Sequence, residues 1–417
     1  MIKPIARGTG AAIAGSVLTM LVAGALLAAV IASETKLTAT DGAPGDLFGS
    51  AMASSVAPSG RTAVIGAHGD DDGGDWAGAA YIFHDDGTGW AEQAKLTASD
   101  GVLKDFFGSS VSISGDMVVV GSFFSDAPAE HSGSAYVYQR TGNTWNEQAK
   151  LVAADGAEGD LFGLSVAIGG DAVVVGARDH DVMAPNSGAA YVFRFGGTSW
   201  TQEAELSASD GATNDFFGEH VAIDGDVVVA GALRADAGRP HSGAAYVFRF
   251  NGTRWTQEAK LAASDGKAGD QFGNSVGISG DTVVVGAARA GRGADRGAAY
   301  VFRFDGTSWS QEAKLTASDP KNKDLFGWSV GISDDQIVVG AIKGDGGGRD
   351  TGAAYVFQRT GTAWSEELKL LASDAEQSDR FGVSVAILQD TVFVGAHGDD
   401  DLGSAAGATY VYALASS

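Results

Sequence analysis

Residues 271–315 read QFGNSVGISGDTVVVGAARAGRGADRGAAYVFRFDGTSWSQEAKL, and this stretch decides the fold. Its centre, Thr282–Ala287, is rich in valine, as expected of a strand that is buried on both faces. Turn pairs at Gly280-Asp281 and Asp305-Gly306 divide the stretch into segments. The predicted strands are Ser275–Ser279, Thr282–Ala287, Gly297–Phe304 and Trp309–Leu315. Four antiparallel strands in one unit are typical of a propeller blade.

The same unit recurs along the chain at a spacing of about 55 residues, which indicates a repeat architecture. Each copy opens with a Phe-Gly pair. The pairs are Phe48-Gly49, Phe107-Gly108, Phe162-Gly163, Phe217-Gly218, Phe272-Gly273, Phe326-Gly327 and Phe381-Gly382. The sequence therefore predicts an all-β, seven-bladed β-propeller that occupies residues 33–417.

The seventh copy lacks a fourth strand. Its three predicted strands lie near Val383–Ile387, Thr391–Ala396 and Ala408–Tyr412. The missing piece is found before the first Phe-Gly pair, where residues 34–37 (ETKL) match the EAKL that ends the fourth strand of the fifth copy. We therefore expect the N-terminal strand to complete blade seven and to close the ring, which removes exposed sheet edges.

Residues 1–32 are predicted to be a signal peptide or an N-terminal membrane anchor. Lys3 and Arg7 precede an uncharged, mostly apolar stretch from Ala11 to Ser33. Small residues before Ser33 suit cleavage by a signal peptidase, whereas the length of the apolar run also suffices to span a bilayer. Both interpretations place the propeller outside the cytoplasm, as a secreted, periplasmic or cell-surface protein, with membrane contact only if the segment is not cleaved.

The composition restricts the partners and the chemistry. The formal net charge of −24 repels nucleic acid and anionic membranes and attracts cations and basic partners. The chain has no cysteine, which excludes disulfides, thiolate metal sites and cysteine nucleophiles.

Acidic residues gather in two of the loops that join the second and third strands of a blade. Blade one carries Asp70, Asp72 and Asp75, and blade seven carries Asp399 and Asp401. Calcium prefers several carboxylate and carbonyl oxygens, so these five residues are the candidate calcium ligands. The alternative is that the two loops are simply solvated. These loops differ from copy to copy, and so we expect function to reside in them.

Two further sets of polar residues recur or cluster in the loops. The loops between blades each carry an Asp pair, such as Asp100/Asp105, which indicates either turn formation or a repeated cation site. Five histidines fall in the variable loops, and we interpret them as surface residues because their spacing is not that of a zinc site. They are His68, His131, His180, His241 and His397.

The opening Phe-Gly pair and the Gly-Ala pair that ends the second strand resemble the FG-GAP repeat of bacterial FG-GAP proteins and of integrin α-subunit propellers. The resemblance covers essentially residues 34–412. It implies an extracellular or cell-surface seven-bladed propeller used for binding or adhesion. Integrins hold calcium in an Asp-rich hairpin between the first two strands of some blades. Here that hairpin is short, as at Ser114-Gly115-Asp116, so no integrin calcium ligand is carried over.

We therefore predict an exported, non-enzymatic binding or adhesion protein that recognises a protein or glycan through its acidic variable-loop face, with calcium as a candidate cofactor. One alternative is a hydrolase or lyase acting on polysaccharides. Glu219-His220 and Trp328 depart from the repeat near the expected channel, and His220 is a candidate general base. A purely structural envelope protein is a third hypothesis.

Overall fold

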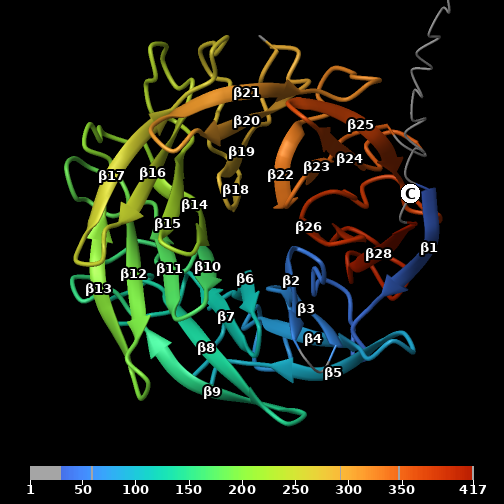
Figure 1. Ribbon diagram of the computed structural model, residues 1–417. Coiled ribbons are helices and arrows are strands. Elements are labelled where there is room, and N and C mark those ends of the chain that lie inside the picture. The colour runs from blue at the N-terminus through green and yellow to red at the C-terminus, as the bar shows by residue number, and fades with distance from the viewer. Residues whose placement is uncertain (1–29, 58–59, 292, 346–347, 416–417) are drawn as a thin grey trace, which may run out of the picture.

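The computed structural model describes residues 30–57, 60–291, 293–345 and 348–415. These residues form no helix, and their 28 strands make seven antiparallel sheets of four strands each. Figure 1 shows the sheets arranged as blades in a ring, with one strand of each blade innermost and another outermost. The all-β, seven-bladed propeller predicted from the repeats is confirmed.

Blades one to four follow one another along the chain. Blade one contains β2 (Ala51–Ala57), β3 (Gly60–Ala67), β4 (Ala79–Asp85) and β5 (Trp90–Leu96). Blade two contains β6 (Phe107–Ser114), β7 (Met117–Ser122), β8 (Ser134–Thr141) and β9 (Thr144–Leu151). Blade three contains β10 (Ser165–Gly169), β11 (Ala172–Ala177), β12 (Ala189–Phe195) and β13 (Trp200–Leu206). Blade four contains β14 (Phe217–Asp224), β15 (Val227–Ala232), β16 (Ala244–Phe250) and β17 (Trp255–Leu261).

The remaining blades complete the ring. Blade five contains β18 (Val276–Ser279), β19 (Thr282–Ala287), β20 (Ala298–Phe304) and β21 (Trp309–Leu315). Blade six contains β22 (Phe326–Ser333), β23 (Gln336–Ala341), β24 (Ala353–Thr360) and β25 (Ala363–Leu370). Blade seven contains β26 (Val385–Leu388), β27 (Thr391–Ala396), β28 (Ala408–Ala415) and, from the other end of the chain, β1 (Val30–Leu37).

The N-terminal strand closes the ring as predicted. β1 pairs antiparallel with β28, with Lys36 opposite Tyr410. In addition, Phe48 of blade one forms a parallel bridge with Gly407 of blade seven, as Phe107 does with Gly78 at the next boundary. Every boundary between blades therefore has the same backbone contact, including the one at which the chain ends meet.

Several strand bounds differ from the expectation. β20 begins at Ala298 rather than Gly297, and β28 ends at Ala415 rather than Tyr412. The first strand of blade five begins at Val276 rather than Ser275, and the first strand of blade seven is Val385–Leu388. β1 begins at Val30, within the segment assigned to the leader, and residues 1–29 of that segment lie outside the described part of the chain. No helix among the described residues is long and apolar enough to cross a membrane.

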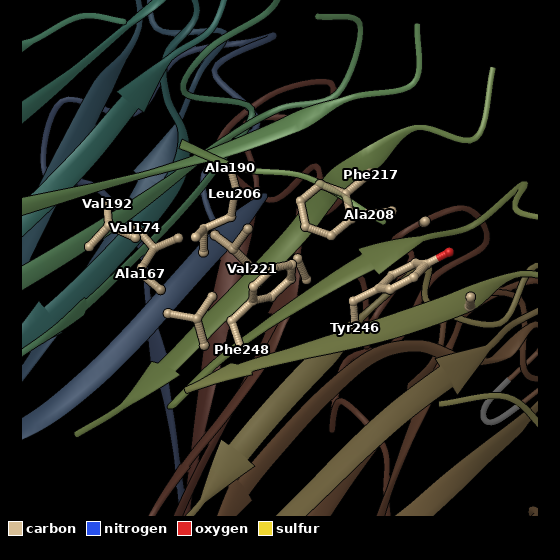
Figure 2. Packing of buried hydrophobic residues seen from close by; sticks show 14 of the residues in the cluster. Ala167, Val174, Ala190, Val192, Leu206, Ala208, Phe217, Val221, Tyr246 and Phe248 are labelled. Carbon is tan, nitrogen blue, oxygen red and sulfur yellow. The ribbon is translucent and has the colours of Figure 1, made fainter. Parts of the chain in front are cut away.

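The hydrophobic core lies between neighbouring blades. Figure 2 shows Val174, Val192 and Leu206 of blade three in one cluster with Phe217 and Tyr246 of blade four, and Tyr246 lies at one edge of the cluster. The Phe217 and Tyr246 rings meet edge to face at 5.6 Å, an arrangement that is worth about 0.5–1.5 kcal/mol beyond the burial of the two rings. Its repetition in each blade explains why the Phe of every Phe-Gly pair is retained.

The glycine of the Phe-Gly pair is required by the same packing. Gly108 has φ = +89°, and a Cβ atom at this position would lie 2.1 Å from the carbonyl oxygen of Ala79 in the preceding blade. No other residue fits such a backbone conformation at so short a distance. The Phe-Gly pair is therefore the contact that joins one blade to the next.

Candidate functional site

The propeller has two unlike faces. The loops between blades and the loops joining second to third strands emerge on one face, which we call the loop face. The tight turns, such as Asp305-Gly306 between β20 and β21, emerge on the opposite hairpin face. The variation between blades is concentrated on the loop face.

A repeated hydrogen-bonded unit supports the loop face from below. In blade two, the Tyr136 hydroxyl donates to Asp100 Oδ1 at 2.8 Å, and Lys150 Nζ donates to Asp100 Oδ2 at 2.8 Å. Burial acts to raise the pKa of Asp100, but the bonds from Lys150 and Tyr136 hold it below its usual value. The same unit recurs at Asp41/Tyr81/Lys95, Asp210/Tyr246/Lys260, Asp265/Tyr300/Lys314, Asp319/Tyr355/Lys369 and Asp374/Tyr410/Lys36.

The second Asp of each pair has a different role. Asp105 is buried, and its Oδ2 accepts the backbone N–H of Val102 at 2.9 Å. The corresponding carboxylates make the same bond to the residue three positions earlier in every other blade. The interpretation as turn formers is thus confirmed for the second Asp of each pair, whereas the first Asp binds a lysine ammonium in six blades.

The structure brings four of the five candidate calcium ligands into two separate clusters. In blade one, Lys95 Nζ lies 2.8 Å from Asp41, 2.8 Å from Asp70 and 2.6 Å from Asp72. Asp75 is exposed and is not among the carboxylates that contact Lys95. The acidic cluster of blade one therefore already contains a positive charge, the ammonium of Lys95.

Blade seven repeats this arrangement. Lys36 Nζ lies 2.8 Å from Asp374, 2.7 Å from Asp399 and 2.6 Å from Asp401. Burial acts to lower the pKa of Lys36, but the three carboxylates raise it above its ordinary value, so this ammonium stays charged at physiological pH. Sequence reasoning missed the contacts of both lysines with these carboxylates, because each lysine belongs to an outer strand far from the loop in the chain.

Exposed apolar side chains also gather on the loop face. Eight large hydrophobic residues are exposed in the described part of the chain, and two of them, Val30 and Ile31, begin β1. The other six lie in loops of the loop face or at the loop-face end of an inner strand. They are Trp76, Val102, Leu103, Met183, Trp328 and Leu402.

Three of these residues adjoin a group of aromatic rings between blades one and two. Trp76 lies 5.4 Å from Phe106, which in turn stacks on Phe123 at 5.4 Å. Leu103, 61% exposed, and Val102 precede Phe106 in the same loop. We call the set His68, Trp76, Val102, Leu103, Phe106, Phe123, Phe124 and His131 the aromatic patch.

The histidines of this patch are not the surface residues that the sequence suggested. His68 and His131 are half-buried, as are His180 and His397, and only His241 of the five loop histidines is exposed. Burial lowers the pKa of His68 to about 4, so its imidazole is neutral near pH 7 and packs as an aromatic ring.

Seven segments of the chain match the FG-GAP repeat. They are residues 32–83, 90–138, 145–193, 200–248, 255–302, 309–357 and 364–412. The chain belongs to the FG-GAP repeat family. Six of the matched segments begin at the Trp of an outer strand and end in the third strand of the next blade, so each FG-GAP repeat spans a blade boundary.

All eight residues of the aromatic patch lie within two of the matched segments, 32–83 and 90–138. The crystal structure of Saccharomyces cerevisiae Sqt1 aligns over 89% of this chain and 84% of the yeast chain, with 11% identity and a TM-score of 0.46. No curated protein sequence matches this FG-GAP repeat chain.

The central channel of this FG-GAP propeller is lined by aliphatic side chains. An open cavity of about 320 Å³ is lined by inner-strand residues such as Val111, Val166 and Ile332, and Ser112 is the sole polar side chain among the residues that line it. His220 lies on β14 and its side chain keeps contact with solvent. Desolvation of the imidazole by the surrounding protein lowers its pKa. The neighbouring Glu219 is engaged with Arg178 at 2.9 Å.

Proposed function

We propose that this FG-GAP propeller is an exported, non-enzymatic binding protein whose loop face recognises a protein partner. The observation that carries the proposal is the location of the exposed large hydrophobic side chains, six of which belong to the loop face. Three of these six, Trp76, Val102 and Leu103, are exposed beside the same group of rings, and apolar side chains exposed next to one another mark an interaction site. The export part of the proposal rests on the apolar leader predicted for residues 1–32.

The aromatic patch is the proposed anchor of the interface. Trp76 is a large side chain that is 37% exposed and is held in place by Phe106, so little side-chain entropy is lost when a partner covers it. The aliphatic Val102 and Leu103 beside it favour a protein over a glycan, because sugars stack on flat rings rather than on branched alkyl groups.

Charge supplies the second element of recognition. The acidic clusters around Lys95 and Lys36 retain exposed carboxylates at Asp72 and Asp401, and the chain has a net charge of −24. A partner with a basic rim around an apolar centre would match this surface and would associate faster at low salt. Binding is therefore expected to weaken as the ionic strength rises.

The central channel is the place where the enzyme alternative expects its catalytic residues. The side chains that line the cavity offer no acid–base pair, and the departures at His220 and Trp328 are not joined by a second group positioned for catalysis among the contacts described. Assay of polysaccharide hydrolysis and elimination tests this point. Turnover that His220→Ala abolishes would favour the enzyme alternative.

A photo-crosslinking residue placed at position 103, and separately at position 307 on the hairpin face, tests which face binds. A protein adduct at position 103 that Trp76→Ala removes supports the proposal. A carbohydrate adduct would instead identify a glycan ligand, and an adduct with a second copy of the chain would favour the structural hypothesis. Equal labelling at both positions would overturn the assignment to the loop face.

A further inference from the structure

Blade three departs from the repeated Tyr–Asp–Lys unit. Asp155 Oδ1 accepts the Tyr191 hydroxyl at 3.0 Å, as the first Asp does elsewhere. In the six other blades, Oδ2 of that Asp accepts a lysine ammonium. In blade three the residue opposite Tyr191 is Glu205, in the register that Lys150 occupies opposite Tyr136. A carboxylate has therefore replaced the cation.

His180, in the loop that joins β11 and β12, lies beside the same two carboxylates. His180 follows β11 at the position that Asp70 and Asp399 occupy in blades one and seven. Its Nε2 lies 3.8 Å from Asp155 Oδ2 and 3.8 Å from Glu205 Oε1. Two oxygens and one nitrogen, all within 4.8 Å of one another, thus surround the place where the other blades hold an ammonium.

The histidine is held in the orientation that a metal ligand needs. His180 Nδ1 lies 2.8 Å from Asp160 Oδ2, and the ring meets Tyr191 edge to face. When Nδ1–H donates to Asp160, the lone pair of Nε2 is directed toward Asp155 and Glu205. A carboxylate behind the imidazole fixes the tautomer and raises the basicity of the ligating nitrogen in metal sites.

We propose that Asp155, His180 and Glu205 bind a divalent transition-metal ion, such as zinc, which supplies the positive charge that lysine supplies in the other six blades. One imidazole and two carboxylates form a donor set that suits zinc and similar ions, whereas calcium prefers oxygen ligands alone. A fourth position faces solvent, because the Asp155 side chain is 49% exposed.

The dimensions agree with such a site. Ligands at about 2.0–2.2 Å from a tetrahedral zinc ion lie about 3.3–3.6 Å apart. The two separations of 3.8 Å from His180 Nε2 therefore need to contract by only a few tenths of an ångström, and the two carboxylate oxygens, which lie within 4.8 Å of each other, need to approach by at most about 1.5 Å. Asp160 and His180 are largely buried and provide the fixed side of the site, while the side chains of Asp155 and Glu205 are 49% and 31% exposed, so they have room to move inward.

One competing explanation uses a proton instead of a metal. The Asp160 hydrogen bond, opposed by burial and reinforced by the charges of Asp155 and Glu205, raises the pKa of His180. A protonated imidazole would then replace the lysine charge without any metal. The two explanations differ in zinc uptake, which provides the test.

Isothermal titration calorimetry with zinc chloride on the whole chain, stripped of metal, is expected to show one site. Glu205→Lys restores the residue that six blades carry, so it is expected to keep the fold and to weaken zinc binding at least 100-fold. His180→Ala is expected to do the same. His241→Ala, a change at an exposed histidine in the equivalent loop of blade four, serves as the matched control and leaves zinc binding unchanged.

Thermal melting of each variant separates loss of the site from loss of the fold. If Glu205→Lys does not fold, Glu205→Gln keeps the volume of the side chain and is expected to weaken zinc binding at least 10-fold. The proposal is wrong if the wild-type chain takes up no zinc, or if Glu205→Lys, Glu205→Gln and His180→Ala bind zinc as tightly as the wild type does.

Discussion

Lys36 Nζ lies 2.8 Å from Asp374 Oδ2, although the two residues are 338 positions apart in the chain. The contact belongs to the same Tyr–Asp–Lys unit that five other blades form from residues much closer together in the chain. Blade seven obtains its lysine from β1, which pairs with β28. The ring is therefore closed by an ion-paired, hydrogen-bonded junction as well as by strand pairing.

The first prediction concerns this junction. Lys36→Ala removes the ammonium from three carboxylates, one of which, Asp399, is buried. We expect the free energy of unfolding to fall by about 1–3 kcal/mol, because a largely buried carboxylate loses its counter-charge. Urea denaturation measures the change. Lys150→Ala removes an ammonium from Asp100 alone, and a loss as large as that of Lys36→Ala would contradict the prediction.

The second prediction concerns the glycine of the Phe-Gly pair. Gly108→Ala places a Cβ atom against the Ala79 carbonyl oxygen at a positive φ, so it is expected to destabilise the propeller by about 3 kcal/mol or more. Gly142 also has a positive φ, +63°, but a Cβ there meets nothing within 4 Å. Gly142→Ala should cost only about 1 kcal/mol. Equal melting temperatures for the two variants would show that the contact between blades is not the cause.

The third prediction concerns pH. Burial lowers the pKa of His68 from its ordinary value of about 6.5 to about 4 in the folded protein. The unfolded chain therefore binds more protons between these values, and stability that is present above pH 6.5 is lost as the pH falls toward 4.

His68→Phe removes this titration and preserves the packing against Trp76 and Phe106. The variant should lose about 1 kcal/mol less than the wild type between pH 6.5 and pH 4.5. The same substitution at the exposed His241 is the control. Parallel stability profiles for the wild type and His68→Phe would refute the assignment.

The fourth prediction concerns calcium. If Asp70 and Asp72 bind calcium, the ion competes with the Lys95 ammonium, which lies 2.8 Å from Asp70 and 2.6 Å from Asp72. Lys95→Met should then bind calcium at least 10-fold more tightly than the wild type, as measured by calorimetry. Lys260→Met in blade four, where Ala235 stands in place of Asp70, is the matched control. No gain in Lys95→Met would exclude a calcium site centred on this lysine.

The architecture could be predicted from the sequence because it depends on features within one repeat. The strand Thr282–Ala287 was predicted with the bounds that β19 has, and the displaced Lys36-Leu37 correctly indicated the closure of the ring. These inferences required only periodicity, turn residues and comparison between copies.

The site could be predicted only in part, because its contacts join residues from different loops and blades. The acidity of Asp70 and Asp399 was visible, but the lysines that lie among these carboxylates come from outer strands. The aromatic patch likewise joins Trp76 of one blade to Phe106 at the start of the next. Glu205 stands where six other copies have lysine, but the sequence analysis did not identify it, because its meaning depends on the position of His180.

The pairing of β1 with β28 also has a consequence for the order of folding. Blades one to six each consist of consecutive strands and are able to form while the rest of the chain is still being synthesised. Blade seven has no fourth strand until the last segment of the chain arrives beside the first. Because contacts of such large sequence separation form slowly, the closing step is expected to limit the rate of folding and to leave both end blades open to mispairing or proteolysis until it is complete.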